Sequence, residues 1–524
     1  MALQRLPVGI QSFEKLRSGD FLYVDKTGDI FRMVSLGNPC SLSRPRRFGK
    51  SLLISTLDCL FSGKKELFEG LYIYDKWDWA ETNPVIRFDF GSQNYQNAKR
   101  LEEDLIDKVN EYAAKYEIEL TRTWAARFAE LIEKIHEKTG KTVVVLVDEY
   151  DKAIIDHLND AKLAAEIRVA LHNFYQVLKA TDDHLRFIFL TGVSKFTRVS
   201  IFSGLNNLKD LTILPNFSTI CGITQQELET HFALYIIDMA NSEDCSQEKV
   251  LERIKYWYNG FSWDGLNFVY NPFSTLQLFQ EKEFRDYWFE SGSPTFLIDM
   301  IKQRNDIETV LEQVTIPAGA LDTFDIENIN TATLLFQTGY LTVKSKRTAF
   351  FGSEPTFFLE IPNNEVRSGL LRHLVAAYAN SNITDVAIAT HKMMEQLATG
   401  NSVAFNQSLQ RLMSRIPYQL HIKHEHYYHS LFLSWLYLLG FTPEAEISTN
   451  VGRIDAVWTW NERVVIAECK YSSTESAEKL IEEAFAQIHE KKYYEHYAGE
   501  NRRIALLAVV FTGKEVESRM VEME

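Results

Sequence analysis

The sequence predicts an α/β protein with a parallel sheet in its amino-terminal part and a second, smaller α/β unit at its carboxyl end. Apolar runs that suit buried parallel strands occur at residues 84–90, 142–147 and 185–194, and they alternate with helical stretches. A helix, a β-hairpin, a second helix and a further strand then follow one another in residues 425–511. Residues 216–420 are predicted to be mostly helical, with a helix and a β-wing.

The chain has 524 residues, which suffices for about three domains. We place the boundaries at 1–215, 216–420 and 421–524. No run of eighteen apolar residues and no signal peptide is present, so we expect no membrane contact. The five cysteines are scattered and form no CxxC pair, which predicts neither a disulfide framework nor a zinc ribbon and favours a reducing cytoplasm.

The net charge of -15 argues against a protein that coats nucleic acid by bulk electrostatics. Any contact with DNA or RNA must therefore use local basic clusters and bound metal. Lys491-Lys492 and Arg502-Arg503 are candidate clusters. The alternative for each pair is an ordinary solvated surface.

A candidate phosphate-binding loop lies near the amino terminus. Gly49-Lys50-Ser51 comes directly before an apolar helix predicted for residues 52–61. Backbone N–H groups at the start of that helix would hold phosphates, Lys50 would reach the β and γ phosphates of ATP, and the Ser51 hydroxyl would join Mg²⁺. The first glycine of the GxxxxGK[ST] motif is missing, because Arg44 stands in its place.

Two acidic residues at the end of a buried strand support this loop. Asp148 and Glu149 follow the apolar run 142–147. Asp148 suits the water shell of Mg²⁺, and Glu149 suits a base that polarises the attacking water. The alternative is a turn whose acids only confer solubility, and the upstream Lys50 makes that alternative less favoured.

A predicted β-hairpin at residues 454–470 brings two carboxylates and a cation together. If its polar turn is centred at residues 461–462, Asp455 and Glu468 stand opposite each other with Cβ atoms about 5 Å apart, and Lys470 lies on the same face. Such carboxylates can hold Mg²⁺ for phosphodiester hydrolysis, while the cation stabilises charge. An exposed ion pair on a surface hairpin is the alternative, but the neighbouring positions are apolar and buried carboxylates need a partner.

The carboxyl-terminal pattern resembles one branch of the PD-(D/E)XK nuclease superfamily. The residues that carry the resemblance are Glu425, Gly452-Arg453-Ile454-Asp455, Glu468-Cys469-Lys470, Gln487-Ile488 and Tyr493. Ile454 replaces the proline of the family name, which removes no group that the chemistry needs. The resemblance implies a restriction-endonuclease-like fold, a metal site and a catalytic group. The metal ligands would be Glu425, Asp455 and Glu468, and the catalytic residues Asp455, Glu468, Lys470 and Gln487.

Further segments resemble the bacterial AAA-ATPase-like proteins that carry such a nuclease domain at the carboxyl end. These segments are residues 23–27, 44–51, 147–151 and 190–194. That group looks as if it uses the Arg-Pro-Arg-Arg-Phe-Gly-Lys-Ser form itself, which accounts for Arg44. The resemblance implies a P-loop ATPase of the ASCE type, the division that uses a catalytic glutamate. The implied ATP-binding residues are Arg46, Arg47, Phe48, Gly49, Lys50, Ser51, Asp148 and Thr191.

Three residues at or beyond the carboxyl end of the strand at 185–194 are weaker candidates for the nucleotide site. Thr191 or Ser194 would sense the γ-phosphate, and Arg198 would act as a charge-stabilising arginine. These roles depend only on position after the strand. Structural hydrogen bonding is the alternative for each of them.

The expected function is that of an ATP-binding protein, an ATPase coupled to a Mg²⁺-dependent nuclease with DNA as its substrate. Nucleotide state would govern the access of DNA to Asp455, Glu468 and Lys470. The alternative is a nucleotide-gated nucleic-acid-binding or interaction protein with an inactive nuclease fold. The winged-helix-like part of the middle region would touch DNA or simply couple the domains. The sequence leaves the formation of a homo-oligomer open.

Overall fold

The computed structural model describes most of the chain, in two compact units. The first unit comprises residues 1–291 and 313–365, and the second comprises residues 292–312 and 366–524. The three domain boundaries stay a prediction. The described residues are 3–91, 93, 95–157, 160–194, 205, 207–291, 295–304, 306–311, 313–322, 330–348, 354–378, 381–398, 402–413, 425–441, 443–449, 452–460, 463–497, 503–512 and 516–523.

The first unit is built on the parallel sheet that the sequence predicts. Its five strands lie in the order β2-β3-β4-β1-β5 and all pairings are parallel. Because β4 lies between β1 and β3, the strand before the phosphate loop and the strand that ends in Asp148 are not neighbours. The bounds are β1 Cys40–Ser43, β2 Val85–Asp89, β3 Val143–Asp148, β4 Leu185–Gly192 and β5 Lys209–Asp210.

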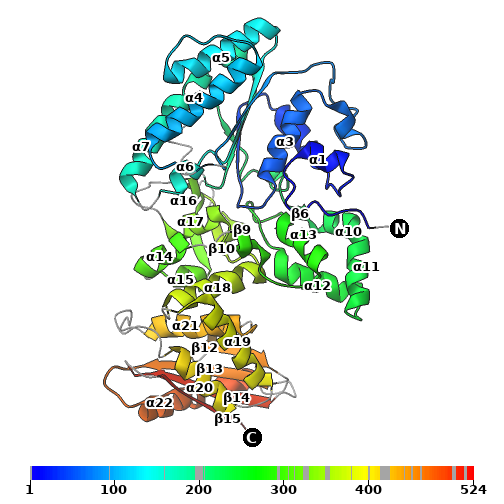
Figure 1. Ribbon diagram of the computed structural model, residues 1–524. Coiled ribbons are helices and arrows are strands. Elements are labelled where there is room, and N and C mark those ends of the chain that lie inside the picture. The colour runs from blue at the N-terminus through cyan, green and yellow to red at the C-terminus, as the bar shows by residue number, and fades with distance from the viewer. Residues whose placement is uncertain are drawn as a thin grey trace. The chain divides into compact units, whose positions relative to one another are not determined.

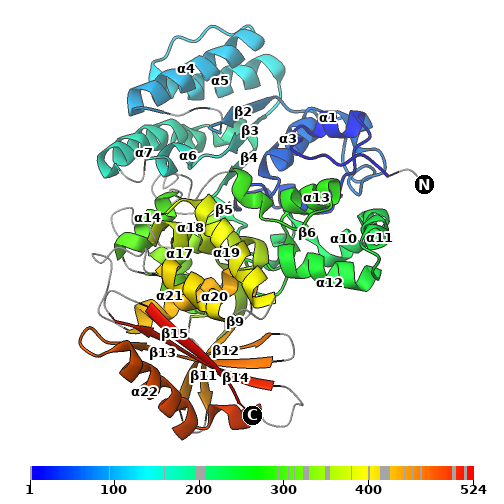
Figure 2. The same ribbon diagram turned by 60° about the horizontal axis from the view of Figure 1, so that its bottom comes forward.

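Helices cover both faces of this sheet. Figure 1 places the strands between α3 on one side and the group of α4, α5 and α7 on the other, and Figure 2 agrees. Phe187 of β4 stacks on Phe61 of α3, while Phe88 of β2 contacts Phe128 of α5 and Phe174 of α7. The bounds are α1 Phe13–Ser18, α2 Thr27–Val34, α3 Lys50–Phe61, α4 Ala98–Lys115, α5 Trp124–Thr139, α6 Lys152–Ile155, α7 Ala161–Tyr175 and α8 Val177–Ala180.

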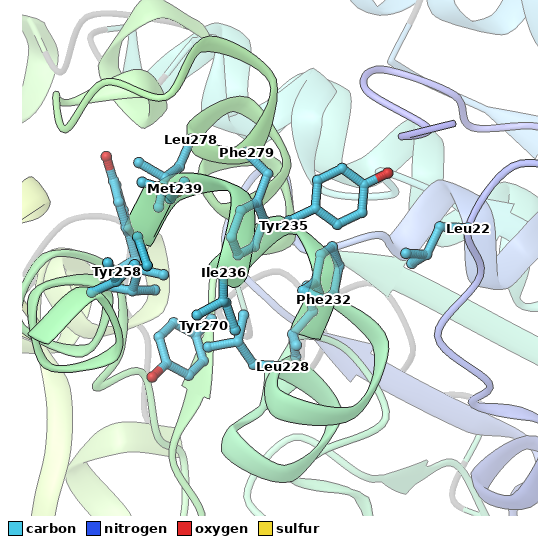
Figure 3. Close-up of a cluster of buried hydrophobic side chains, with 14 of the residues drawn as sticks. Leu22, Leu228, Phe232, Tyr235, Ile236, Met239, Tyr258, Tyr270, Leu278 and Phe279 are labelled. Atoms are coloured by element: carbon cyan, nitrogen blue, oxygen red, sulfur yellow. The ribbon is translucent and has the colours of Figure 1, made fainter. Parts of the chain in front are cut away.

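A second hydrophobic cluster joins the middle of the chain to the amino-terminal segment. Leu22 packs with Phe232, Tyr235 and other buried side chains of the middle helices (Figure 3). The Lys26 ammonium lies 2.6 Å from the carboxylate of Glu227 at the start of α10. The elements are β6 Ile223–Thr224, α10 Gln225–His231, α11 Ala233–Ser242, α12 Gln247–Tyr258, β7 Val269–Tyr270 and α13 Pro272–Glu281.

The predicted helix and β-wing are present in the first unit. Helix α17 is followed by an antiparallel pair of strands, β9 and β10, and β8 adds a third strand in the order β8-β10-β9. The bounds are β8 Val314–Pro317, α16 Ala318–Asp322, α17 Thr331–Thr338, β9 Thr342–Arg347 and β10 Thr356–Glu360. The fold class predicted for the middle region is therefore confirmed.

The second unit has a five-stranded mixed sheet in the order β11-β12-β13-β14-β15. The β13–β14 pairing is parallel and the others are antiparallel. Helix α22 packs on one face through Ile488, and α21 packs through Phe432 against Trp458 (Figure 1). The strands are β11 Glu444–Thr449, β12 Gly452–Trp460, β13 Arg463–Tyr471, β14 Arg503–Phe511 and β15 Val516–Glu522.

The second unit includes helices from the middle region of the chain as well as from its carboxyl-terminal part. They are α14 Thr295–Arg304, α15 Glu308–Leu311, α18 Asn364–Tyr378, α19 Ile383–Ala398, α20 Ser402–Met413, α21 Glu425–Leu438 and α22 Ala477–Glu490. The first two residues of α18 belong to the first unit, so this helix crosses the division between the units. Among the described residues, no helix is both long and apolar enough to cross a membrane.

Candidate functional site

The phosphate loop connects β1 to α3, and its backbone turns through left-handed conformations. Gly49 immediately precedes α3 with φ 86°, and Arg47 has φ 68°. Glycine suits such a position because it has no Cβ atom to clash. Lys50 begins α3, and its buried ammonium donates to the carbonyl oxygens of Arg44 and Pro45, each at 2.9 Å. The Lys50 ammonium thus lies inside the loop that is expected to bind the phosphates.

Arg44 explains the missing first glycine of the motif. Its buried guanidinium donates to the carbonyl oxygens of Thr212 and Phe217 at 2.9 and 3.0 Å and lies 3.8 Å from the centre of the Trp263 ring. Burial lowers the pKa of Arg44 to about 10, while nearby acidic groups oppose this shift. The arginine therefore anchors the loop to the segment after β5, a role that glycine cannot fill.

The two acids at the end of β3 are held close to the loop. Burial raises the pKa of Asp148, while a hydrogen bond from Ser51 and the charge of Lys50 lower it. Asp148 Oδ1 is buried without a hydrogen-bond partner in the part of the chain that the structure describes. A buried carboxylate oxygen normally has a partner, so this atom fits a Mg²⁺ ion or one of its waters.

Glu149 occupies a strained position at the mouth of the site. Its φ is 52°, which is uncommon for a residue with a side chain. A Cβ atom added to Gly91 would lie 2.7 Å from Glu149 Oε2, so the glycine leaves room for the carboxylate. Burial raises the pKa of Glu149 and the charge of Lys50 opposes this shift. Strained backbone with a perturbed carboxyl group is typical of functional sites.

A cavity of about 540 Å³ opens beside the loop and the acids. Six of the predicted site residues line it: Arg46, Arg47, Gly49, Lys50, Ser51 and Glu149. Apolar side chains from the amino-terminal segment, α1 and α13 also line it, namely Pro7, Ile10, Leu16, Pro272, Phe273 and Leu276. A nucleoside triphosphate needs both kinds of wall, because its phosphates are charged and its base is largely apolar.

Phe48, Thr191 and Asp148 are not among the residues that line this cavity. The Phe48 ring packs 4.8 Å from Phe261. The buried Thr191 hydroxyl donates to the Leu42 carbonyl at 2.9 Å, which joins β4 to β1. This geometry favours the structural alternative for Thr191, because its hydroxyl is already engaged between two strands. Arg198 lies outside the described residues.

Two parts of the site were missed from the sequence. Asp151, which is buried and lines the cavity, accepts hydrogen bonds from the backbone N–H and the hydroxyl of Ser194 and so joins the ends of β3 and β4. The apolar wall from α13 was also missed. Its signal was present, because Asn271 caps the helix by accepting from Phe273 N and Ser274 N, with Pro272 at the first helical position.

The hairpin of the second unit has the predicted register. Its pairs run from Trp460 with Arg463 to Ala456 with Ala467, and Asp455 and Glu468 are the next residues in that register. Asp455 Oδ2 accepts a 2.7 Å hydrogen bond from the backbone N–H of Cys469. This bond links the two strands just beyond the pair of Ala456 with Ala467, so the carboxylate is fixed against β13.

The buried Glu468 carboxylate is the centre of the second site. Lys470 Nζ lies 2.8 Å from Glu468 Oε1, and Gln487 Nε2 of α22 donates to the same oxygen. Burial raises the pKa of nearby Tyr493, which shares a hydrogen bond with Gln487, and the charges of Glu468 and Asp455 raise it further. The structure thus brings together Asp455, Glu468, Lys470 and Gln487.

Helix α21 supports this site through its backbone. His429 Nε2 donates to the Asp455 carbonyl at 2.8 Å, a contact that the sequence did not indicate. Glu425 is the first residue of the same helix, but its side chain is not among those described. Among the described residues, no three His, Cys, Asp or Glu side chains form a group that would hold a metal ion. Asp455 and Glu468 supply two oxygen donors of the type that Mg²⁺ prefers.

Comparisons with known proteins identify the families of the amino-terminal and carboxyl-terminal parts of the chain. Residues 7–202 match a family model described as a predicted AAA-ATPase, and residues 423–520 match a model of the PD-(D/E)XK nuclease superfamily. An uncharacterized protein in the vnfD 5' region of Azotobacter chroococcum mcd 1 is 38% identical over 520 residues. That similarity covers 98% of this chain and 97% of the Azotobacter protein.

Proposed function

Because this chain belongs to the bacterial AAA-ATPase-like proteins with a carboxyl-terminal PD-(D/E)XK nuclease-superfamily domain, we propose that it couples ATP hydrolysis to Mg²⁺-dependent cleavage of DNA. The observation that carries the proposal is that Asp455, Glu468, Lys470 and Gln487 lie together in the second unit. The first unit of the same chain has a cavity lined by the phosphate loop and Glu149. The protein would act in the cytoplasm on nucleic acid.

In the first unit, ATP would occupy the cavity with its phosphates at the loop and its base against α13. Lys50 would exchange its bonds with the carbonyls of Arg44 and Pro45 for bonds with the β and γ phosphates. Ser51 and Asp148 would hold Mg²⁺, which when bound screens the charge of the phosphates. Glu149 would orient the attacking water, and its raised pKa suits a group that accepts a proton.

In the second unit, Asp455 and Glu468 would hold Mg²⁺, with Glu425 as a further ligand implied by the family. The bound metal would lower the pKa of a water that attacks the phosphodiester. Lys470 would move from Glu468 to the scissile phosphate and stabilise its growing negative charge. Gln487 would keep the Glu468 carboxylate oriented through their hydrogen bond.

A second candidate function is a nucleotide-gated nucleic-acid-binding protein whose nuclease fold is inactive. One observation favours it. Lys470 and Gln487 both engage Oε1 of Glu468, so the charge of this buried carboxylate is compensated by the protein itself. In that case the site binds nucleic acid through Lys470 and needs no metal.

Calorimetry with Mn²⁺ beside a cleavage assay distinguishes the two functions. For a nuclease, Asp455→Ala lowers both metal affinity and cleavage, whereas Lys470→Ala keeps the metal and loses cleavage. For a binding protein, the wild type cuts no DNA or RNA with Mg²⁺ or Mn²⁺, and its nucleic-acid affinity falls with Lys470→Ala. Arg519→Ala is a matched control, because it removes an exposed cation of the same unit that pairs with Glu478.

A further inference from the structure

The phosphate loop is held by the middle of the chain as well as by the sheet. Five consecutive loop residues each contact a residue beyond β5 in the sequence. Arg44 lies over Trp263, Pro45 packs against Gly339, the Arg46 carbonyl accepts from Trp288, Arg47 lies over Phe273, and Phe48 packs on Phe261. In a phosphate loop the backbone N–H groups, the lysine and the following hydroxyl bind the phosphates and Mg²⁺, and none of these five contacts uses those groups. The contacts therefore connect the loop to something other than the phosphates.

Binding of a phosphate would change the hydrogen bonds that Lys50 makes within the loop. In this structure it is closed on Lys50, whose ammonium donates to the Arg44 and Pro45 carbonyls. A bound phosphate would attract the same ammonium, and those two carbonyls would lose their donor. The next carbonyl, that of Arg46, accepts from Trp288 Nε1 at 3.2 Å. Loss of the Lys50 bond to the Pro45 carbonyl would therefore alter the geometry of the neighbouring hydrogen bond between Trp288 Nε1 and the Arg46 carbonyl.

Trp288 connects the loop to Glu365 through its own backbone. Its indole ring is buried against Tyr340, with ring centres 5.0 Å apart. Its backbone N–H donates to Glu365 Oε1 at 2.9 Å. A rigid, buried side chain transmits a displacement to its own backbone better than a solvated one, because close packing leaves it few other positions.

The bond between Trp288 and Glu365 lies where the chain changes units. Trp288 is in the 3₁₀ helix η4, Tyr287–Ser291, and the chain leaves the first unit after Ser291. Glu365 is in the first turn of α18, and the chain leaves the first unit again directly after it. One hydrogen bond thus links both points of departure.

We propose that Trp288 is a positioning residue that responds to the state of the phosphate loop and passes it, through Glu365, to α18 and the nuclease unit. Closed on Lys50, the loop holds Trp288 and Glu365 as they are in this structure. With nucleotide bound, the pair shifts and the first turn of α18 shifts with it. The inference depends on the proposed nucleotide site, and it assigns the regulation of the nuclease to a particular contact.

The Glu365 carboxyl group is fully buried and accepts a hydrogen bond from the backbone of Trp288. Burial raises its pKa to about 8, while the hydrogen bond from the Trp288 N–H lowers it. A carboxyl oxygen and an amide oxygen both accept hydrogen bonds. Glu365→Gln should therefore keep the link, and Glu365→Leu should break it.

Hydrogen exchange of the full chain, with and without a non-hydrolysable ATP analogue and Mg²⁺, tests the proposal. In wild type and Glu365→Gln, the analogue should change exchange in residues 366–378. Trp288→Phe keeps an aromatic ring but lacks the N–H donor. It should bind the analogue within about tenfold of wild type, since one neutral hydrogen bond is lost, yet show no change in these residues. Glu365→Leu should behave in the same way.

Trp257→Phe is the matched control, because it makes the same substitution in a side chain that packs against the cluster of Figure 3. It should keep the full response. The proposal is overturned if Trp288→Phe and Glu365→Leu respond like wild type, or if wild type binds the analogue without any change in residues 366–378. A wild type that binds no analogue would instead refute the nucleotide site, and the inference would fall with it.

Discussion

Replacing the buried Glu365 by glutamine should stabilise the first unit, and more so as the pH rises. Glu365 has no exposed surface, and its Oε1 accepts from the Trp288 N–H. Burial is the main cause of its raised pKa, and the charges of Asp286 and Glu290 add to it. Glutamine has the same shape and keeps an acceptor, but it cannot ionise. The substitution therefore removes the free-energy cost of taking up a proton on folding, or of burying a charge where the carboxyl group stays ionised.

The size of the effect follows from the pKa in the two states. The pKa of Glu365 is about 8 in the folded protein, against an ordinary value of 4.5. Because the folded value is raised, the unfolded chain releases this proton first, and the stability of wild type falls as the pH rises from the lower value to the upper one. This linkage predicts that the glutamine variant gains about 2–3 kcal/mol relative to wild type between about pH 5 and pH 7.

Urea unfolding of the full chain at several pH values measures this gain. The transition of the first unit is compared between wild type and Glu365→Gln, because two units need not unfold together. Glu14→Gln is the control, since it removes an exposed carboxylate of the first unit that pairs with Lys64 and is not among the charges that raise the pKa of Glu365. Stability curves of wild type and Glu365→Gln that stay parallel across this pH range would refute the reasoning.

Three further predictions concern the two sites. Lys50→Ala should weaken ATP binding, because Lys50 contacts the ground-state phosphates, whereas Glu149→Gln should keep binding and slow hydrolysis, because Glu149 acts on the attacking water. Equal nucleotide affinities for wild type and Lys50→Ala in calorimetry would contradict this. Arg44→Gly, which restores the usual glycine, should nevertheless lower stability by about 2–4 kcal/mol, because two buried carbonyls lose a charged donor; an unchanged thermal midpoint would oppose it. Asp455→Ala should reduce metal-dependent cleavage by orders of magnitude while the fold survives, and circular dichroism beside the cleavage assay would expose a variant that is merely unfolded.

Local patterns in the sequence were enough to predict the sheet and the hairpin. The apolar run 142–147 is of the kind that forms a buried parallel strand, and its residues 143–147 lie in β3. The turn expected at 461–462 lies outside the described residues, but the register that it predicts pairs Ala456 with Ala467 and so places Asp455 beside Glu468, as the strands show. In both cases the deciding information lies within a few residues of the element.

Contacts between distant segments could not be predicted in this way. Arg44 was explained only by a resemblance, because its partners Thr212 and Phe217 lie far along the chain. Thr191 was expected at the phosphates, but its hydroxyl bonds to Leu42 on a strand that is distant in sequence. The edge strand β15 was not predicted, and it pairs with β14 across a short connection.

The nucleotide dependence of DNA cleavage shows whether the nucleotide site controls the nuclease site. Cleavage by wild type, Lys50→Ala and Asp455→Ala is followed in Mg²⁺ or Mn²⁺, with and without ATP. We expect ATP to change the rate for wild type, Lys50→Ala to cut at a rate that ATP no longer changes, and Asp455→Ala not to cut in either condition. A wild-type rate that is the same with and without ATP, although ATP binds, would contradict the coupling of the two sites.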